Sequence, residues 1–210
     1  YYDYTGDFNF VERNYEYMKL LMAFYTERAA WKGLIPQVNS SWVVIDWHDI
    51  EKDGYSCAVQ MLYGRALRVM AFFAAKMHAD ADAQHYRTLA DRVYRNVNEI
   101  YWSDSLNGYV STCRDGHPST QICHHQNCFA ILFGYADDAK KEAMIEHVYK
   151  NLSVKEITTP FFKFFQYEAM YQCGLTKDIL ADIRSYWGRM TDAGAKTVYE
   201  EFDPDVTGVE

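Results

Sequence analysis

The sequence lacks both a long apolar run and a cluster of basic residues. None of its 210 residues lies in a stretch approaching the roughly 20 apolar residues that a membrane-spanning helix requires. The formal net charge is −8, and lysine and arginine do not gather along any segment. Because nucleic acids and acidic membrane surfaces bind through positive patches, we expect neither nucleic acid nor a membrane as a partner.

The sequence also lacks the motifs of disulfide frameworks, metal centres and serine nucleophiles. Its five cysteines are odd in number and show no Cys-x-x-Cys spacing. It contains no Gly-x-Ser-x-Gly segment, no phosphate-binding glycine loop and no His-Glu-x-x-His segment. His124 and His125 have no carboxylate at the spacing of a metal site, so we favour a structural or rim role for them. The sequence therefore predicts no cofactor and no metal.

Aromatic residues, by contrast, are abundant. They make up 17% of the chain, with 18 Tyr, 12 Phe and 5 Trp. Most of these rings are expected in the core, but the number exceeds what a core alone usually needs. Clefts that bind sugars use such rings, because the apolar face of a pyranose stacks on an aromatic plane while its hydroxyls form hydrogen bonds.

Apolar residues recur at three- and four-residue steps along most of the chain, the pattern of amphipathic helices. Asp80 and Asp82 are expected to form a turn whose carboxylate caps the next helix, and Asn107-Gly108 predicts a tight turn between two short strands. Consecutive helices form hairpins of about 50 residues, which predicts an all-α fold with short β excursions. Helices are predicted over about 9–30, 56–78, 82–101, 120–135, 138–152, 161–172 and 176–190.

The segment after the last predicted helix carries two adjacent carboxylates. The helical pattern stops at Gly194, and a β-branched and aromatic run leads to Glu200 and Glu201 before the turn at Asp203-Pro204. Neighbouring side chains of an extended segment point to opposite faces. Only one of the two glutamates is therefore expected to face a pocket unless the backbone bends.

This segment carries a resemblance to a known family. Gly194-Ala-Lys-Thr-Val-Tyr-Glu200 resembles the Gly-Ala-Thr-Thr-x-Trp-Glu stretch of the bacterial α-L-rhamnosidases, with Lys196 in place of a Thr and Tyr199 in place of the Trp. The preceding Tyr186-Trp187-Gly188-x-Met190 is also similar to the approach to that motif. In the family the Glu of this motif is the general base of an inverting glycosidase, which implies that role for Glu200.

A second element of the resemblance lies in the long loop predicted between residues 31 and 55. Ile45-Asp46-Trp47 resembles the Phe-x-Asp-Trp element of the same family. The resemblance implies that Asp46 accepts hydrogen bonds from sugar hydroxyls and that Trp47 walls the pocket. Tyr199 is expected to contact the substrate as well, whereas Trp187 is equally compatible with a pocket wall and with the core.

The resemblance extends over nearly the whole chain and implies an architecture. The catalytic domain of the family is an (α/α)6 toroid of six helical hairpins, and the predicted helices fill somewhat more than half of it. We therefore expect residues 1–210 to form a single domain, the C-terminal half or more of such a barrel, within a longer chain. The family's acidic Asp-x-x-x-Glu motif, which supplies the general acid, does not occur here and is expected upstream of Tyr1.

The resemblance implies hydrolysis of terminal α-L-rhamnosyl linkages in a carbohydrate substrate, by a protein exported to the periplasm or beyond. Two alternatives remain open. Another six-hairpin enzyme, such as an uronyl hydrolase or a glucosidase-like member, would place basic residues on the pocket loops, where Lys32, Arg114 and Lys196 are the candidates. A non-catalytic helical module would bind sugar or protein without turnover.

Overall fold

The computed structural model describes residues 1–37, 43–47 and 50–203, and most of these are helical. The helices are α1 (Tyr2–Thr5), α2 (Phe8–Arg28), the 3₁₀ turn η1 (Trp31–Gly33), α3 (Cys57–Lys76), α4 (Asp80–Tyr101), α5 (His124–Leu132), α6 (Asp138–Met144) with the π-helical turn η2 (Ile145–Tyr149), α7 (Pro160–Gln172), and α8 (Thr176–Asp182) with η3 (Ile183–Trp187) and α9 (Gly188–Asp192). Residues 38–42 and 48–49 of the predicted long loop, and the end of the Asp203–Asp205 turn, lie outside the described residues.

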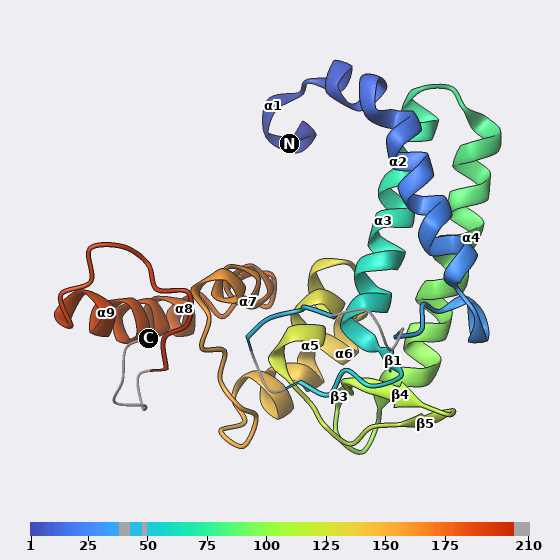
Figure 1. Cartoon of the computed structure of the whole chain (residues 1–210). Helices are drawn as coiled ribbons and strands as arrows, with labels where there is room; N and C mark the ends of the chain where they lie inside the picture. The colour runs from blue at the N-terminus through green and yellow to red at the C-terminus, as the bar shows by residue number, and fades with distance from the viewer. Residues whose placement is uncertain (38–42, 48–49, 204–210) are drawn as a thin grey trace.

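The helices follow one another in hairpins along an open arc (Figure 1). The long pair α3 and α4 lies at one end with α2 beside it, and α7 to α9 lie at the other end. Within the arc, α3 contacts α5 and α5 contacts α7, so these three helices form a continuous row. The predicted all-α fold built from helical hairpins is confirmed. No helix in the described ranges is long and apolar enough to cross a membrane.

The α3–α4 hairpin forms because each helix carries an apolar stripe that faces the other. The buried face of α4 includes Ala90, Val93 and Val97, which are at most 1% exposed. The expected aspartate cap is wrong, because α4 begins at Asp80 with Ala79 at its N-cap and without a capping side chain. Asp82 instead accepts a hydrogen bond from Tyr15 of α2 at 3.2 Å, so it ties two helices together.

Gly64 of α3 leaves no room for a side chain between α3, α4 and Tyr135. A Cβ atom placed there would lie 2.2 Å from the Tyr135 hydroxyl oxygen and 3.0 Å from Val93 Cγ1. Gly64→Ala is therefore expected to lower the free energy of unfolding by about 1–3 kcal/mol through overpacking. Gly188 is the matched control, because its backbone is helical and nothing lies within 4 Å of an added Cβ. Thermal unfolding should show Gly188→Ala unchanged or stabilised; equal behaviour of the two variants would contradict the packing argument.

Short strands join the hairpins at one rim. The antiparallel pair β2 (Trp102–Ser103) and β3 (Gly108–Tyr109) encloses the predicted turn, in which Asn107 takes a φ of +52°. A second sheet has the order β1 (Tyr55–Ser56), β4 (Thr112–Arg114) and β5 (His117–Pro118). The helix predicted from about residue 120 begins only at His124, because Ile122 forms a β-bridge with Val110.

Candidate active site

The two segments that carry the resemblance meet in the structure. Trp47 Nε1 donates a hydrogen bond to Glu200 Oε1 at 2.8 Å, although 153 positions separate the two residues in the sequence. The contact lies at a hollow of about 230 Å³ between the loop before β1, the start of α7 and the segment after α9. Its lining residues are Val44, Ile45, Asp46, Trp47, Thr159, Phe161 and Glu200.

Asp46 lines this hollow, and two hydrogen bonds to one of its oxygens hold it in place. Its Oδ2 accepts from His125 Nε2 at 2.8 Å and from Thr159 Oγ1 at 2.6 Å. Thr159 is the N-cap of α7, yet its hydroxyl serves Asp46 instead of capping the helix. Burial alone would raise the pKa of Asp46, but the hydrogen bonds from His125 and Thr159 outweigh it and hold the pKa below its ordinary value.

His125 lies in the first turn of α5 and is fully buried, with its ring tilted against Phe162 at 4.2 Å. Burial lowers the pKa of His125, and the positive charge of Lys52 adds to this effect, while the Asp46 carboxylate opposes it. A neutral imidazole that donates its Nε2 proton to Asp46 agrees with the structural role predicted for this histidine. Within the described part of the chain, no three His, Cys, Asp or Glu side chains are grouped so that they could hold a metal ion.

The two shifts predict how stability depends on pH. The pKa of His125 in the folded protein lies below the ordinary 6.5. As the pH falls below 6.5, His125 is protonated more readily in the unfolded chain than in the folded protein, and this lowers the stability of the folded protein. The pKa of Asp46 lies below the ordinary 3.8, and its contribution is lost as the pH falls through the folded value. Acid should therefore lower the melting temperature, and His125→Gln should flatten the part of this decline that begins at about pH 6.5. Parallel curves for the two proteins would show that His125 does not contribute.

The second glutamate faces elsewhere. Glu201 Oε1 accepts a hydrogen bond from Thr158 Oγ1 at 3.1 Å, and Glu201 is not among the residues that line the hollow. The backbone of Thr158 holds the same segment, since its carbonyl oxygen accepts from Phe202 N and from the Tyr186 hydroxyl, both at 2.8 Å. The structure thus separates the two neighbouring carboxylates, with Glu200 at the hollow.

Trp187 and Tyr199 are not among the residues that line the hollow. Trp187 is half-buried, and its Nε1 donates to the Tyr167 hydroxyl at 3.1 Å. The ring of Tyr199 stacks on that of Phe202, with 5.9 Å between the ring centroids. In this arrangement Trp187 belongs to the packing of α7 against η3, and Tyr199 supports the segment that carries Glu200.

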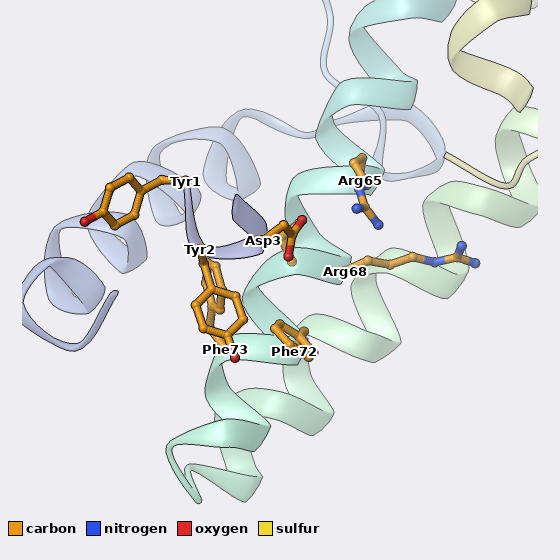
Figure 2. A pocket seen from close by; sticks show the side chains of 8 residues that line it. Tyr1, Tyr2, Asp3, Arg65, Arg68, Phe72 and Phe73 are labelled. Carbon is orange, nitrogen blue, oxygen red and sulfur yellow. The ribbon is translucent and has the colours of Figure 1, made fainter. Parts of the chain in front are cut away.

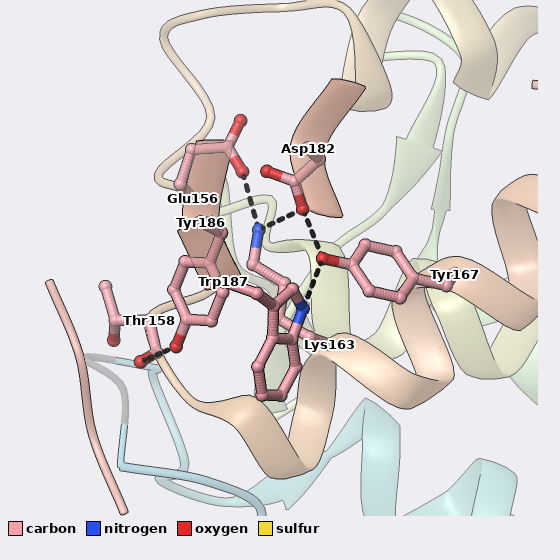
Figure 3. Close-up of polar contacts among 7 residues, drawn as sticks. All are labelled: Glu156, Thr158, Lys163, Tyr167, Asp182, Tyr186 and Trp187. Carbon is pink, nitrogen blue, oxygen red and sulfur yellow. Dashed lines mark hydrogen bonds and ion pairs between the residues drawn. The ribbon is translucent and has the colours of Figure 1, made fainter. Parts of the chain in front are cut away.

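The sequence patterns did not predict the charge cluster that surrounds the buried Lys163 (Figure 3). Lys163 of α7 is only 2% exposed, and its Nζ lies 2.9 Å from Asp182 Oδ2 and 3.8 Å from Glu156 Oε2. The Tyr167 hydroxyl donates to the same Asp182 oxygen at 2.7 Å. The ammonium group also lies 4.8 Å from the centre of the Tyr186 ring. The cluster thereby joins α7 to α8 and η3.

Three further hollows in the described part of the chain contain none of Asp46, Trp47, Trp187, Tyr199 and Glu200. One, of about 410 Å³, lies between α1 and α3 and is lined by side chains that include Tyr2, Asp3, Arg65, Phe72 and Phe73 (Figure 2). Another, of about 380 Å³, lies beside the Lys163 cluster. The residues expected from the sequence therefore point to the hollow at Glu200.

Two solved structures share this architecture. Over 96% of its length the chain matches the GH78 family rhamnosidase of Bacillus sp. GL1, with a TM-score of 0.85 and 25% identity, and it covers 22% of that chain. Over 97% of its length it matches a rhamnosidase from Klebsiella oxytoca with rhamnose bound, with a TM-score of 0.82 and 22% identity, and it covers 38% of that chain. The chain thus spans well under half of either structure. No curated protein matches the chain.

The hairpin architecture and these likenesses define the class as a helical-hairpin glycosidase domain. Residues 1–208 match the family described as the bacterial alpha-L-rhamnosidase 6 hairpin glycosidase domain. The chain belongs to this family. The resemblance inferred from the sequence motifs, and the fold class that it implied, are therefore confirmed.

Proposed function

We propose that the chain forms part of the catalytic domain of an inverting glycoside hydrolase that acts on terminal α-L-rhamnosyl linkages, with Glu200 as general base. The observation that carries this proposal is the contact between Trp47 and Glu200, which joins the two rhamnosidase-like motifs at one hollow. Membership of the family supports the reaction class. A related structure described with rhamnose bound supports a carbohydrate ligand.

The chemistry needs two carboxyl groups with different tasks. In an inverting glycosidase, one protonates the leaving oxygen and the other activates a water, and they lie about 6.5–9.5 Å apart. Glu200 suits the second task because it is exposed at the hollow and belongs to the matching motif. The acidic motif of the family does not occur in the chain. We infer that the general acid lies outside these 210 residues and that the chain alone has little or no activity.

The walls of the hollow favour a neutral sugar over a uronate. Lys32 pairs with Glu99 at 2.6 Å and Arg114 pairs with Asp53 at 2.7 Å. Neither of these basic residues, nor Lys196, is among the described residues that line the hollow. Recognition of a uronate carboxylate normally uses such cations. This arrangement supports a deoxyhexose such as rhamnose over an uronyl group.

The test is hydrolysis of an aryl α-L-rhamnoside by a protein that contains this chain within its complete catalytic domain. Proton NMR should show that the first product is the inverted anomer. Retention of configuration would contradict the proposed mechanism. If rhamnosides were inert, other aryl glycosides would identify the substrate. Sugar binding that survives Glu200→Gln, with no turnover of any glycoside, would favour the non-catalytic module.

A further inference from the structure

The contact between Trp47 and Glu200 is exposed, which raises the question of what holds it in place. Trp47 is 51% exposed and Glu200 is also exposed. A hydrogen bond at such a site contributes little net free energy, because water competes for both groups. The contact alone therefore does not fix the orientation of the glutamate. Other residues must therefore fix the position of Trp47, the donor of this hydrogen bond.

The residue next to Trp47 supplies such a support. Asp46 is 7% exposed, and its carboxylate is fixed by His125 and Thr159. One donor lies in α5 and the other is the N-cap residue of α7, so they approach one oxygen from different elements. Hydrogen bonds to a buried carboxylate are charge-assisted and stronger than those between neutral groups. Because Asp46 and Trp47 share a peptide bond, fixing the first restricts the second.

The two donors are themselves enclosed by the fold. His125 is 0% exposed and Thr159 is 1% exposed. Neither presents enough surface to serve as the main contact of a sugar in the hollow. His125 does not line the hollow, and Thr159 lines it with a hydroxyl that already donates to Asp46, so both residues act on the hollow mainly through Asp46.

We propose that His125 and Thr159 are positioning residues that act on the general base through Asp46 and Trp47. The two residues hold the Asp46 carboxylate, and Asp46 in turn sets the position of Trp47. The indole N–H of Trp47 then donates a hydrogen bond to Glu200 Oε1. This leaves the second carboxylate oxygen of Glu200 to accept the proton from water. The inference rests on the proposed function for its catalytic consequence, whereas the coupling between the four side chains can be tested without it.

The experiment compares variants that remove each donor with variants that keep it, in the complete catalytic domain. Thr159→Val keeps the shape and loses the hydroxyl, while Thr159→Ser keeps the hydroxyl. His125→Leu removes the imidazole, while His125→Gln keeps an N–H donor. The matched control is Thr158→Val, which loses the hydroxyl that serves Glu201. The two removing variants act on one carboxylate from different helices, so either one that folds decides the result.

The first measurement is the indole N–H resonance of Trp47 in protein labelled with ¹⁵N-tryptophan, assigned with Trp47→Phe. Thr159→Val and His125→Leu should shift or broaden it, and Thr158→Val should not. An unchanged resonance in the removing variants would overturn the inference. This result does not depend on activity, so it stands apart from any failure of the proposed function.

The second measurement is kcat on an aryl rhamnoside. Trp47→Phe and Thr159→Val should each lower kcat about tenfold, which corresponds to about 1.4 kcal/mol. Since both act through one indole N–H, the double variant should be little slower than Trp47→Phe alone. Additive losses, or a Trp47→Phe protein with unchanged kcat, would refute the proposed coupling.

Discussion

Glu200→Gln should lower the rate of rhamnoside hydrolysis by about 10²–10⁴-fold, the contribution typical of a general base. The amide keeps the size of the side chain, and its carbonyl oxygen can still accept the hydrogen bond from Trp47. It cannot take a proton from the attacking water. The loss should therefore appear in kcat, with a small change in KM. Steady-state kinetics on an aryl α-L-rhamnoside would measure it.

Glu201→Gln is the control that the structure provides for this prediction. The two residues are adjacent, carry the same charge and are both exposed, but Glu201 contacts Thr158 and does not line the hollow. We expect the Glu201 variant to retain nearly full activity. If Glu201→Gln were the inactive protein and Glu200→Gln the active one, the assignment of the base would be reversed. Equal losses in both would indicate disruption of the segment instead.

Local sequence patterns predicted most of the helices because the signals that define a helix or a turn lie within a few residues of one another in the sequence. The apolar stripes of α3 and α4 and the Asn107 turn are each encoded within a few residues of one another. The errors arose where a tertiary partner competes with a local role. Asp82 was expected in the turn that caps α4, but it accepts from Tyr15 of another helix. Thr159 shows the same competition, although no cap was predicted there: it is the N-cap residue of α7, but its hydroxyl donates to Asp46.

The sequence predicted only part of the site, because some of its contacts join residues that are far apart in the chain. Family motifs indicated Asp46, Trp47 and Glu200, and the structure places these three at one hollow. The contribution of His125 could not be read in this way, because its partner lies 79 positions away and no spacing rule links them.

Lys163 left a local signal that could have been used. It stands between Phe161-Phe162 and Phe164-Phe165. A single charge within an aromatic run on a helix suggests a buried, paired lysine, since lysine is almost never fully buried without a partner.

The pairing of Lys163 predicts the largest effect on stability. Asp182→Ala would leave a cation that is 2% exposed with Glu156 as its remaining acidic neighbour, at 3.8 Å. Breaking a buried pair costs 3–5 kcal/mol, and because Asp182 is 31% exposed we expect the lower end, about 3 kcal/mol. The Tyr167 hydroxyl would lose its acceptor as well. Denaturant unfolding would measure the loss.

Replacing both partners tests whether the cost comes from the uncompensated charge. Lys163→Met together with Asp182→Leu removes the charge and fills similar volume, so the double variant should regain much of the stability that Asp182→Ala loses. The exposed pair of Lys32 and Glu99 is the control. Its 2.6 Å separation is shorter than that of the buried pair, but both side chains reach solvent, so Glu99→Ala should change stability little. If the shorter, exposed pair proved the more costly to break, distance rather than burial would govern the energetics of these ion pairs.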